Sequence, residues 1–298
     1  MGEETAVARE RRVDVRKMYK LFINGAFVRS ESARSTPLWD GRAFLANIAQ
    51  ASRKDLRDAV TAARAAQGRW WAQDPQLRGL MLYRLGEMIE ARRSEYIDLL
   101  SGGDGTDIRS ARAEIDSSID RVLWYAGWCD KYSALLSSKN PVAGPHFNCS
   151  TPEPMGVVGI LAPQSPLFLG IISTLLPPLV AGNAIVLLAS ERDPRPAIAL
   201  AEAIALSDIP SGVVSILTGF RSEIGPAMAK HDGIEAIACG REDLAQWGEI
   251  ERESAASIKR IRPFEIDRAA DYFNDRAQSL DSIADFCEIK TIWHPVGL

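Results

Sequence analysis

Thiols and imidazoles are the side chains of this sequence best suited to nucleophilic or metal chemistry, and their spacing restricts what they can do. The four cysteines are widely separated and form no Cys-x-x-Cys pair, and the three histidines are equally scattered. That spacing predicts neither a disulfide framework nor a structural metal site. Cys239 is the one thiol that we place near a predicted cleft, where it is either a nucleophile or a small buried hydrophobe at a strand end.

The segment Gly156–Glu191 reads as strand, break, buried helix, turn and strand, which is typical of a unit that holds a nucleotide. It contains neither G-x-G-x-x-G nor G-x-x-x-x-G-K-[ST], and it has no lysine or arginine. From Gly156 onward strand and helix alternate four times with short links, which predicts a parallel sheet with right-handed crossovers. Such sheets bind ligands at the carboxyl ends of their strands. These ends are Ala162–Ser165, Ala189–Glu191, Thr218–Gly219 and Cys239–Arg241.

The residues before Gly156 predict a hairpin followed by helices. Asn24-Gly25 suits a two-residue hairpin turn, because both central residues need a positive φ. Ser52 with Asp55 three residues later resembles a capping box at the start of a first helix. We expect a second helix at 77–100 and a third at 107–136. Aromatic side chains of the third helix are expected to pack between helices: Trp124, Tyr125 and Trp128.

After Arg241 the alternation is expected to stop. Residues 243–261 predict one polar helix, and an irregular charged segment leads to Ser279. The end of the chain, FCEIKTIWHPVGL, predicts a strand with one mostly apolar face and one mixed face. A lone strand buries too little to be stable in water, so it must pair with a sheet edge in this chain or another.

Composition and charge restrict the class of protein. The 298 residues are 46% hydrophobic and 25% charged, with a net charge of -4, which is the balance of a globular protein. The cluster Arg9–Arg12 lies in a charged tail, so nothing in the remainder predicts nucleic-acid binding. No apolar run is long enough for a membrane span, and the N-terminus lacks a signal-peptide pattern. We therefore expect a cytoplasmic protein without a membrane or nucleic-acid partner.

Several stretches, taken in order, resemble the aldehyde dehydrogenase superfamily. KLFINGAFV is similar to its opening hairpin, and ANIAQASRKDLRDAVTAARAA to its first helix. PMGVVGILAP and AGNAIVLLASE resemble the strands that flank its cofactor helix, and IPSGVVSILTG the approach to the third strand. FCEIKTIWHP resembles its C-terminal oligomerisation strand. The resemblance covers about Met18 to Gly240 and the last residues.

The resemblance implies an NAD or NADP site and shows where this sequence departs from it. Ser165 lies nearest the oxyanion asparagine of the family, and Leu188 replaces the lysine that contacts the ribose. Losing that charge-assisted hydrogen bond removes about 1.5–3 kcal/mol, so we expect weak cofactor binding or none. A Leu188→Lys substitution is expected to strengthen binding only if the rest of the site is intact. The remaining cofactor candidates are Ser190, Glu191, Gly219, Gly240 and Arg241.

No stretch resembles the family's Gly-Gln-x-Cys nucleophile segment or its Glu-Leu-Gly-Gly-Lys segment. The weak catalytic candidates are Cys239 and Ser165. The first hypothesis is a truncated member that is inactive alone and assembles with itself or with a full-length aldehyde dehydrogenase. The alternatives are a genuine NAD(P)-dependent aldehyde oxidoreductase, which uses Cys239 or a partner's cysteine, and a binding module for a nucleotide or metabolite.

The expected fold class is α/β, with a Rossmann-like parallel sheet, an N-terminal helical region and a small oligomerisation sheet. The expected segments are a disordered tail (1–17), a hairpin with helices (18–150), a Rossmann-like cofactor-type domain (151–258), a linker (259–280) and an oligomerisation strand (281–298).

Overall fold

The computed structural model describes residues 17–297 except 103–105, 241–243, 265 and 267. The expected tail lies outside the described residues apart from Lys17, whose ammonium group is 2.8 Å from the Glu202 carboxylate. Arg241, one of the expected cofactor contacts, also lies outside them.

A seven-stranded sheet forms the centre of the molecule, and its strand order is β12-β11-β8-β9-β10-β2-β3. Its first five strands are parallel and the last two are antiparallel. Continuous apolar runs build the parallel part because those strands are covered on both faces. The predicted α/β class and parallel sheet are confirmed. The strands are β12 (Arg260–Phe264), β11 (Ala236–Gly240), β8 (Val157–Leu161), β9 (Ala184–Leu188), β10 (Val214–Leu217), β2 (Leu21–Ile23) and β3 (Ala26–Val28).

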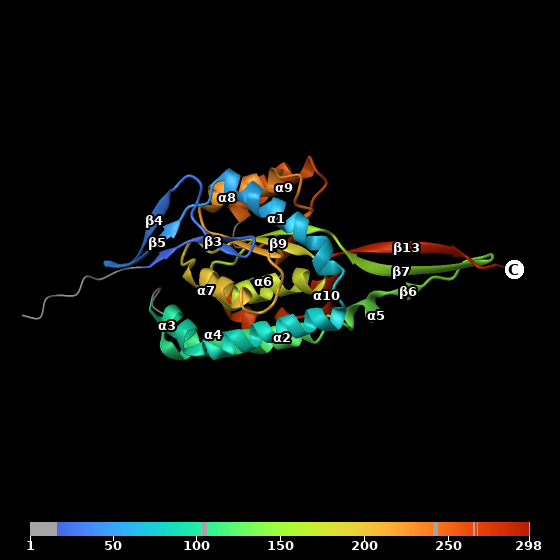
Figure 1. The fold of residues 1–298 in the computed structure, drawn as a ribbon, viewed down its shortest axis with the longest axis horizontal. Coiled ribbons are helices and arrows are strands. Elements are labelled where there is room, and N and C mark those ends of the chain that lie inside the picture. Colours follow the sequence, from blue (N-terminus) through green and yellow to red (C-terminus); the bar gives the residue numbers. More distant parts are fainter. Residues whose placement is uncertain (1–16, 103–105, 241–243, 265, 267, 298) are drawn as a thin grey trace, which may run out of the picture.

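Helices cover both faces of this sheet (Figure 1). One face packs against α1 (Arg53–Trp71), α8 (Arg221–Lys230) and α9 (Leu244–Ala255). The other packs against α6 (Leu169–Val180) and α7 (Arg195–Ile204), and a further layer of helices lies beyond them. That outer layer consists of α2 (Pro75–Ala91), α3 (Arg93–Ser101) and α4 (Ile108–Ala126).

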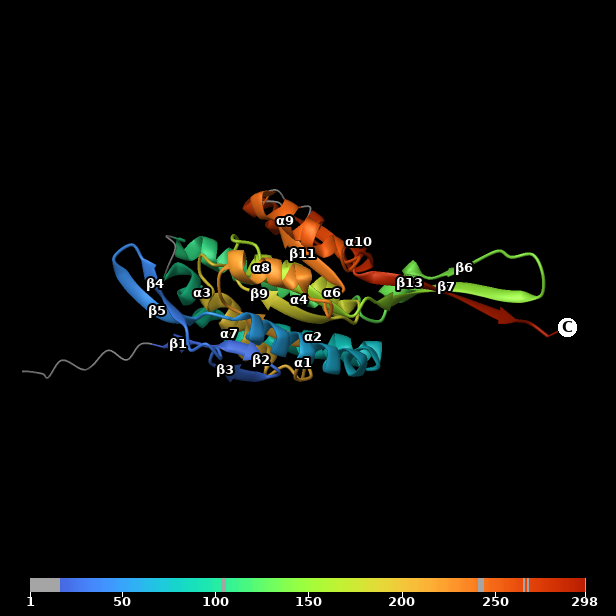
Figure 2. The same ribbon diagram turned by 90° about the horizontal axis from the view of Figure 1, so that it is seen from above.

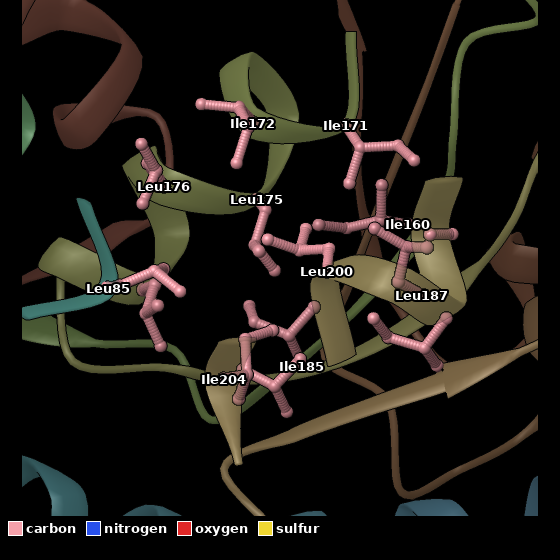
Figure 3. Close-up of a cluster of buried hydrophobic side chains, with 14 of the residues drawn as sticks. Leu85, Ile160, Ile171, Ile172, Leu175, Leu176, Ile185, Leu187, Leu200 and Ile204 are labelled. Atoms are coloured by element: carbon pink, nitrogen blue, oxygen red, sulfur yellow. The ribbon is translucent and has the colours of Figure 1, made fainter. Parts of the chain in front are cut away.

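The core around α6 joins three of these layers (Figure 3). Ile171 and Leu175 of α6 lie close to Ile160 of β8 and Leu187 of β9, and all four side chains are at most 1% exposed. Leu85 of the outer layer belongs to the same cluster. The apolar helix between the two strands is thus buried all round, as the sequence predicts.

The N-terminal elements confirm two local predictions. Asn24 and Gly25 have φ angles of 52° and 76° and join β2 to β3 as a two-residue hairpin. Ser52 caps α1, and the side chain of Asp55 accepts from the Ser52 backbone, which completes the capping box. A separate small sheet contains β1 (Met18–Tyr19), β5 (Ala43–Ala49) and β4 (Ser35–Asp40).

Two expected helices are each divided in the structure. The segment expected as one helix at 77–100 is α2 and α3, which meet at Arg92. The helix expected at 107–136 ends with Gly127 at its C-cap, and the separate α5 (Tyr132–Leu136) follows. The aromatic cluster is as predicted, since the ring centroids of Trp124 and Trp128 are 5.4 Å apart at the edge of the core.

The expectation that the alternation stops after Arg241 is wrong. α9 ends at Ala255, and residues 260–264 form β12, which pairs in parallel with β11 along its whole length. The segment expected as a linker therefore contains the fifth parallel strand. It then continues through the short helices η2 (Ala269–Phe273), η3 (Asp275–Ala277) and α10 (Leu280–Ala284).

A second three-stranded sheet extends from the body as an arm (Figures 1 and 2). It consists of β6 (Ser138–Lys139), β7 (His146–Pro154) and β13 (Cys287–Pro295), with β7 in the middle. β13 pairs antiparallel with β7 of the same chain, which is one of the two pairings that the sequence left open. The Asn24-Gly25 hairpin joins the main sheet through β10 and contributes nothing to the arm.

Candidate functional site

Three of the predicted cofactor residues meet at the carboxyl edge of the main sheet. Ser190 and Glu191 follow β9, Gly219 follows β10, and all three line one small cavity. The opposite wall comes from β4 and β5, including Thr36 and Gln50. The volume of the cavity is about 90 Å³, whereas pockets for small-molecule ligands hold roughly 300–1,000 Å³.

The polar side chains at this edge of the sheet are hydrogen-bonded to other groups of the same chain. The Ser190 hydroxyl donates to Gln164 Oε1 at 2.7 Å and accepts from the Arg192 backbone at 3.2 Å. The Glu191 carboxylate accepts a hydrogen bond from the backbone N–H of Arg221, the first residue of α8. Glu191 is exposed, and this bond at the helix N-terminus uses one of its two carboxylate oxygens and holds the side chain against α8.

Gly219 and Gly240, two of the predicted cofactor contacts, lie against other segments of the same chain. Gly219 has a φ of 153°, and a Cβ there would lie 3.3 Å from the backbone nitrogen of Ala51. Gly240 is buried as the last residue of β11 and pairs with Phe264 of β12. The segment before α1 is thus the part of the chain that approaches Gly219. Gly240 does not line the small cavity.

Leu188 lies in the core, with none of its side chain exposed. It belongs to the apolar cluster beneath α1 and α8, together with Leu161 and Cys239. The position that the resemblance assigns to a ribose-binding lysine is thus filled by hydrophobic packing. It offers neither a charge nor access to a ligand.

Cys239 is completely buried in β11, and burial raises the pKa of its thiol to about 12. Nearby Arg221 lowers that pKa, but the desolvation effect is larger. A thiol with this pKa is almost entirely protonated near neutral pH, and the thiolate is the nucleophile in cysteine chemistry. The structure therefore favours the small-hydrophobe interpretation of Cys239.

Ser165 lies half-buried in the loop between β8 and α6. It makes no capping hydrogen bond to α6, although a serine just before a helix often does. The cap comes instead from Glu114 of α4, whose Oε1 accepts from the backbone nitrogens of Phe168 and Leu169 at 2.6 and 3.1 Å. Sequence reasoning missed Glu114, although an acidic residue within the apolar stripe of its helix was the available signal.

Glu114 is 7% exposed, and burial raises the pKa of its carboxyl group. We expect Glu114→Ala to lower the free energy of unfolding by roughly 2–4 kcal/mol, because two buried N–H groups lose their acceptor. Glu114→Gln keeps one carbonyl acceptor and is expected to have less than half that effect. Urea denaturation of both variants tests this, and equal losses would contradict the capping role.

The pH dependence provides a second readout for Glu114. Because its folded-state pKa is raised, its contribution to stability is complete at pH values below its unfolded pKa and is lost as the pH rises through its folded pKa. Glutamine does not titrate. The stability of the natural chain relative to Glu114→Gln should therefore fall between acidic and neutral pH.

In the described part of the chain, no three His, Cys, Asp or Glu residues gather closely enough to hold a metal ion. Nor does any helix there have the length and apolar character needed to cross a bilayer.

Comparison with known proteins places this geometry in a family. The aldehyde dehydrogenase family profile matches residues 35–262. The chain belongs to the aldehyde dehydrogenase family. The match extends through α9 into β12, so the expected limit at Gly240 was too early.

The relatives are longer than this chain. The putative aldehyde dehydrogenase DhaS of Bacillus subtilis is 33% identical over 248 residues, which are 81% of this chain and 49% of that protein. Human retinal dehydrogenase 2 is 30% identical over 82% of this chain and 48% of its own length. The chain therefore spans about half the length of the curated relatives it matches.

Solved structures agree with the sequence comparison. The aldehyde dehydrogenase of Bacillus cereus in its NAD⁺ complex has a TM-score of 0.78 at 28% identity, over 83% of this chain and 51% of that one. A putative aldehyde dehydrogenase from Burkholderia cenocepacia has a TM-score of 0.77 at 31% identity, over 82% of this chain and 50% of that one. The Rossmann-like fold is therefore that of NAD-complexed relatives.

The described residues do not fit a bound dinucleotide in the arrangement that the structure shows. Leu188 is inaccessible, Ser190 and Glu191 are already hydrogen-bonded, and the cavity that they line is too small. This family member thus keeps the cofactor-type sheet, while the strand ends bind their own chain.

Proposed function

We propose that this chain is a non-catalytic member of the aldehyde dehydrogenase family that acts through assembly, with itself or with a full-length relative. The observation that carries the proposal is the arm of β6, β7 and β13. From Glu288 to Pro295 every residue of β13 is exposed, on both faces of the ribbon. A sheet that is exposed on both faces lacks the buried face that normally stabilises a sheet.

The arm also concentrates apolar surface. Ile289 is 58% exposed and Trp293 is 61% exposed. They are four residues apart in β13, so both lie on the same face of the strand. Phe147, on the neighbouring β7, is 43% exposed. Phe147 pairs with His294, so it lies on the other face of the ribbon from Ile289 and Trp293. Exposed apolar and aromatic side chains are typical of interaction surfaces, and here they occur on both faces. Burial of this ribbon against another subunit would cover both faces at once.

The carboxyl edge supports the non-catalytic part of the proposal. Cys239 is buried and protonated near neutral pH, so it does not serve as the thiolate that aldehyde oxidation through a covalent intermediate needs. Ser190 and Glu191, which would hold NAD or NADP, are hydrogen-bonded to Gln164 and to the Arg221 backbone. The same features argue against a genuine oxidoreductase that uses Cys239.

Assembly is tested by light scattering of the purified chain and by co-purification with a coexpressed full-length aldehyde dehydrogenase. We expect an oligomer in at least one of the two experiments. Ile289→Lys should shift that oligomer toward monomer, because a charge is then desolvated in the interface. Leu80→Lys on α2 is the matched control, since Leu80 is also 58% exposed but lies away from the arm. A monomer in both experiments would contradict the proposal.

Cofactor binding is tested separately by calorimetry with NAD and NADP. We expect weak binding or none, and no reduction of either cofactor when simple aldehydes are added. A dissociation constant in the low-micromolar range would show that the carboxyl edge opens. Turnover that disappears in Cys239→Ala would favour the oxidoreductase alternative instead.

A further inference from the structure

A second cavity lies on the other side of the sheet from Leu188, between α6, β12 and the segment that leads to the arm. Its volume is about 440 Å³, which is within the roughly 300–1,000 Å³ of pockets for small-molecule ligands. Ser173 and Pro177 of α6 form one wall, and Arg262 and Phe264 of β12 form another. Figure 2 shows α10, whose residues close a third side, near the base of β13.

One wall of this cavity lies outside the family match. The profile ends at residue 262, whereas Arg276, Gln278 and Phe286 line the cavity from the segment beyond it. The cavity is therefore formed on one side by residues within the family match and on the other by residues that follow it in the chain.

A buried positive charge lies directly behind the cavity wall. Arg121 of α4 is 4% exposed, and its guanidinium donates to Ser173 Oγ at 2.5 Å, Asn274 O at 3.3 Å and Gln278 Oε1 at 3.4 Å. All three acceptors are neutral. Burial lowers the pKa of Arg121, and the exposed Asp275 offsets that effect only in part. A buried charge is costly unless it is neutralised by an opposite charge, so this arrangement favours a further negative group nearby.

Arg121 also determines the orientation of the Gln278 amide. A guanidinium can only donate, so the amide oxygen must face Arg121. The amide nitrogen is then at the opposite end, as a donor on a residue that lines the cavity. The bond to Arg121 thus fixes the Gln278 amide so that its nitrogen can donate a hydrogen bond into the cavity.

Two further arginines line the cavity, with two aspartates beside them. Arg262 Nε lies 3.3 Å from an oxygen of Asp285, so these two charges largely balance. Arg276 and Asp281 are both exposed at the rim. With Arg121 and Asp275 included, the positive and negative charges are equal in number, so the placement of the hydrogen-bond donors, and not a net charge, favours an anion. Pro177, Phe264 and Phe286 supply an apolar surface.

We propose that this cavity binds a small organic anion, a carboxylate attached to a compact apolar or aromatic group. Arg276 and the Gln278 amide nitrogen hold the carboxylate, and the apolar surface of Phe264 and Phe286 holds the body of the molecule. The site is separate from the carboxyl edge of the sheet and does not depend on assembly through the arm.

Calorimetry of the full chain with phenylacetate tests the proposal, with neutral phenylacetamide and inorganic phosphate as comparison probes. We expect saturable binding of phenylacetate, and at least tenfold weaker binding of each comparison probe, because each lacks one half of the recognised chemistry. Arg276→Gln should weaken phenylacetate binding by about tenfold to a hundredfold. Arg53→Gln, an exposed arginine on α1, is the matched control and should bind as the natural chain does.

Gln278→Glu separates ligand binding from a structural role. A glutamate at this position brings its own carboxylate to Arg121, so we expect a higher melting temperature together with loss of phenylacetate binding. If Gln278 has only a structural role, the natural chain does not bind phenylacetate and Gln278→Glu changes the melting temperature alone. Absence of saturable phenylacetate binding, equal affinity for phenylacetamide, or unchanged affinity in both Arg276→Gln and Gln278→Glu would overturn the proposal.

Discussion

Leu188→Lys should destabilise the fold by about 4 kcal/mol, because a pKa depressed by about 3 units is typical of a fully buried lysine. The side chain has no exposed surface and packs in the cluster that contains Leu161, Cys239 and Ile224. A lysine there must either carry its charge into this cluster or lose its proton. The sequence alone suggested that the same substitution could restore a ribose contact.

The pH dependence identifies the cause of that loss. The introduced lysine has a lower pKa in the folded state than in the unfolded state, so its penalty grows as the pH falls from its unfolded pKa toward its folded one. Chemical denaturation at pH values from neutral to alkaline measures this trend. Leu188→Met should cost less than about 1.5 kcal/mol at any of these pH values. A Leu188→Lys protein of nearly natural stability that binds NAD tightly would show that the core interpretation is wrong.

The parallel sheet could be predicted because its physical cause is local. Unbroken apolar runs such as β8 and β9 specify strands buried on both faces, and the helix between them is apolar all round. The hairpin at Asn24-Gly25 and the Ser52 cap are equally local, and both were predicted. By contrast, β12 was missed because arginines and Pro263 interrupt its apolar pattern.

The charges of β12 have a specific task that its sequence does not reveal. Arg260 donates to the Cys287 carbonyl at 2.8 Å and to the Glu288 carboxylate at 2.7 Å. Arg262 donates to the Asp285 carbonyl at 3.3 Å. These arginines hold the base of the arm against the edge of the main sheet. A strand that is charged for this reason resembles a solvated segment when only periodicity is considered.

The candidate site could be predicted only in its location. The rule that ligands bind at the carboxyl ends of strands correctly brought Ser190, Glu191 and Gly219 together. It could not predict that Glu191 binds the Arg221 backbone, or that Gly219 approaches Ala51. Those contacts join residues that are far apart in the chain, and neither residue type nor spacing encodes them.

Asn183→Ala should lower the free energy of unfolding by roughly 3 kcal/mol, because four hydrogen bonds to the backbone are lost, two of them fully buried. Asn183 has no exposed surface. Its Oδ1 accepts from the backbone nitrogens of Met155 and Gly156 at 2.8 and 2.9 Å. Its Nδ2 donates at 3.0 Å to the carbonyls of Pro178 and Phe286. One side chain thus connects the end of α6, the residues between β7 and β8, and the base of β13.

Asn183→Asp is the informative companion, because it has the same shape and keeps the Oδ1 acceptor. It replaces the Nδ2 donor by an oxygen that faces two carbonyls, so we expect a loss at least as large as that of the alanine variant at neutral pH. Lowering the pH protonates the aspartate and restores one donor, so part of the loss should be recovered. Urea denaturation measures stability, and amide hydrogen exchange at β13 measures how firmly the arm is held.

If β13 exchanges faster in both Asn183 variants while the main sheet stays protected, Asn183 positions the arm. Assembly by light scattering should then weaken in proportion, although Asn183 is buried and cannot contact a partner. If stability falls but β13 exchange and assembly stay unchanged, the arm is held by Arg260 and Arg262 alone. The proposed assembly depends on where the arm points, so we expect its orientation to be fixed inside the body before any partner is met.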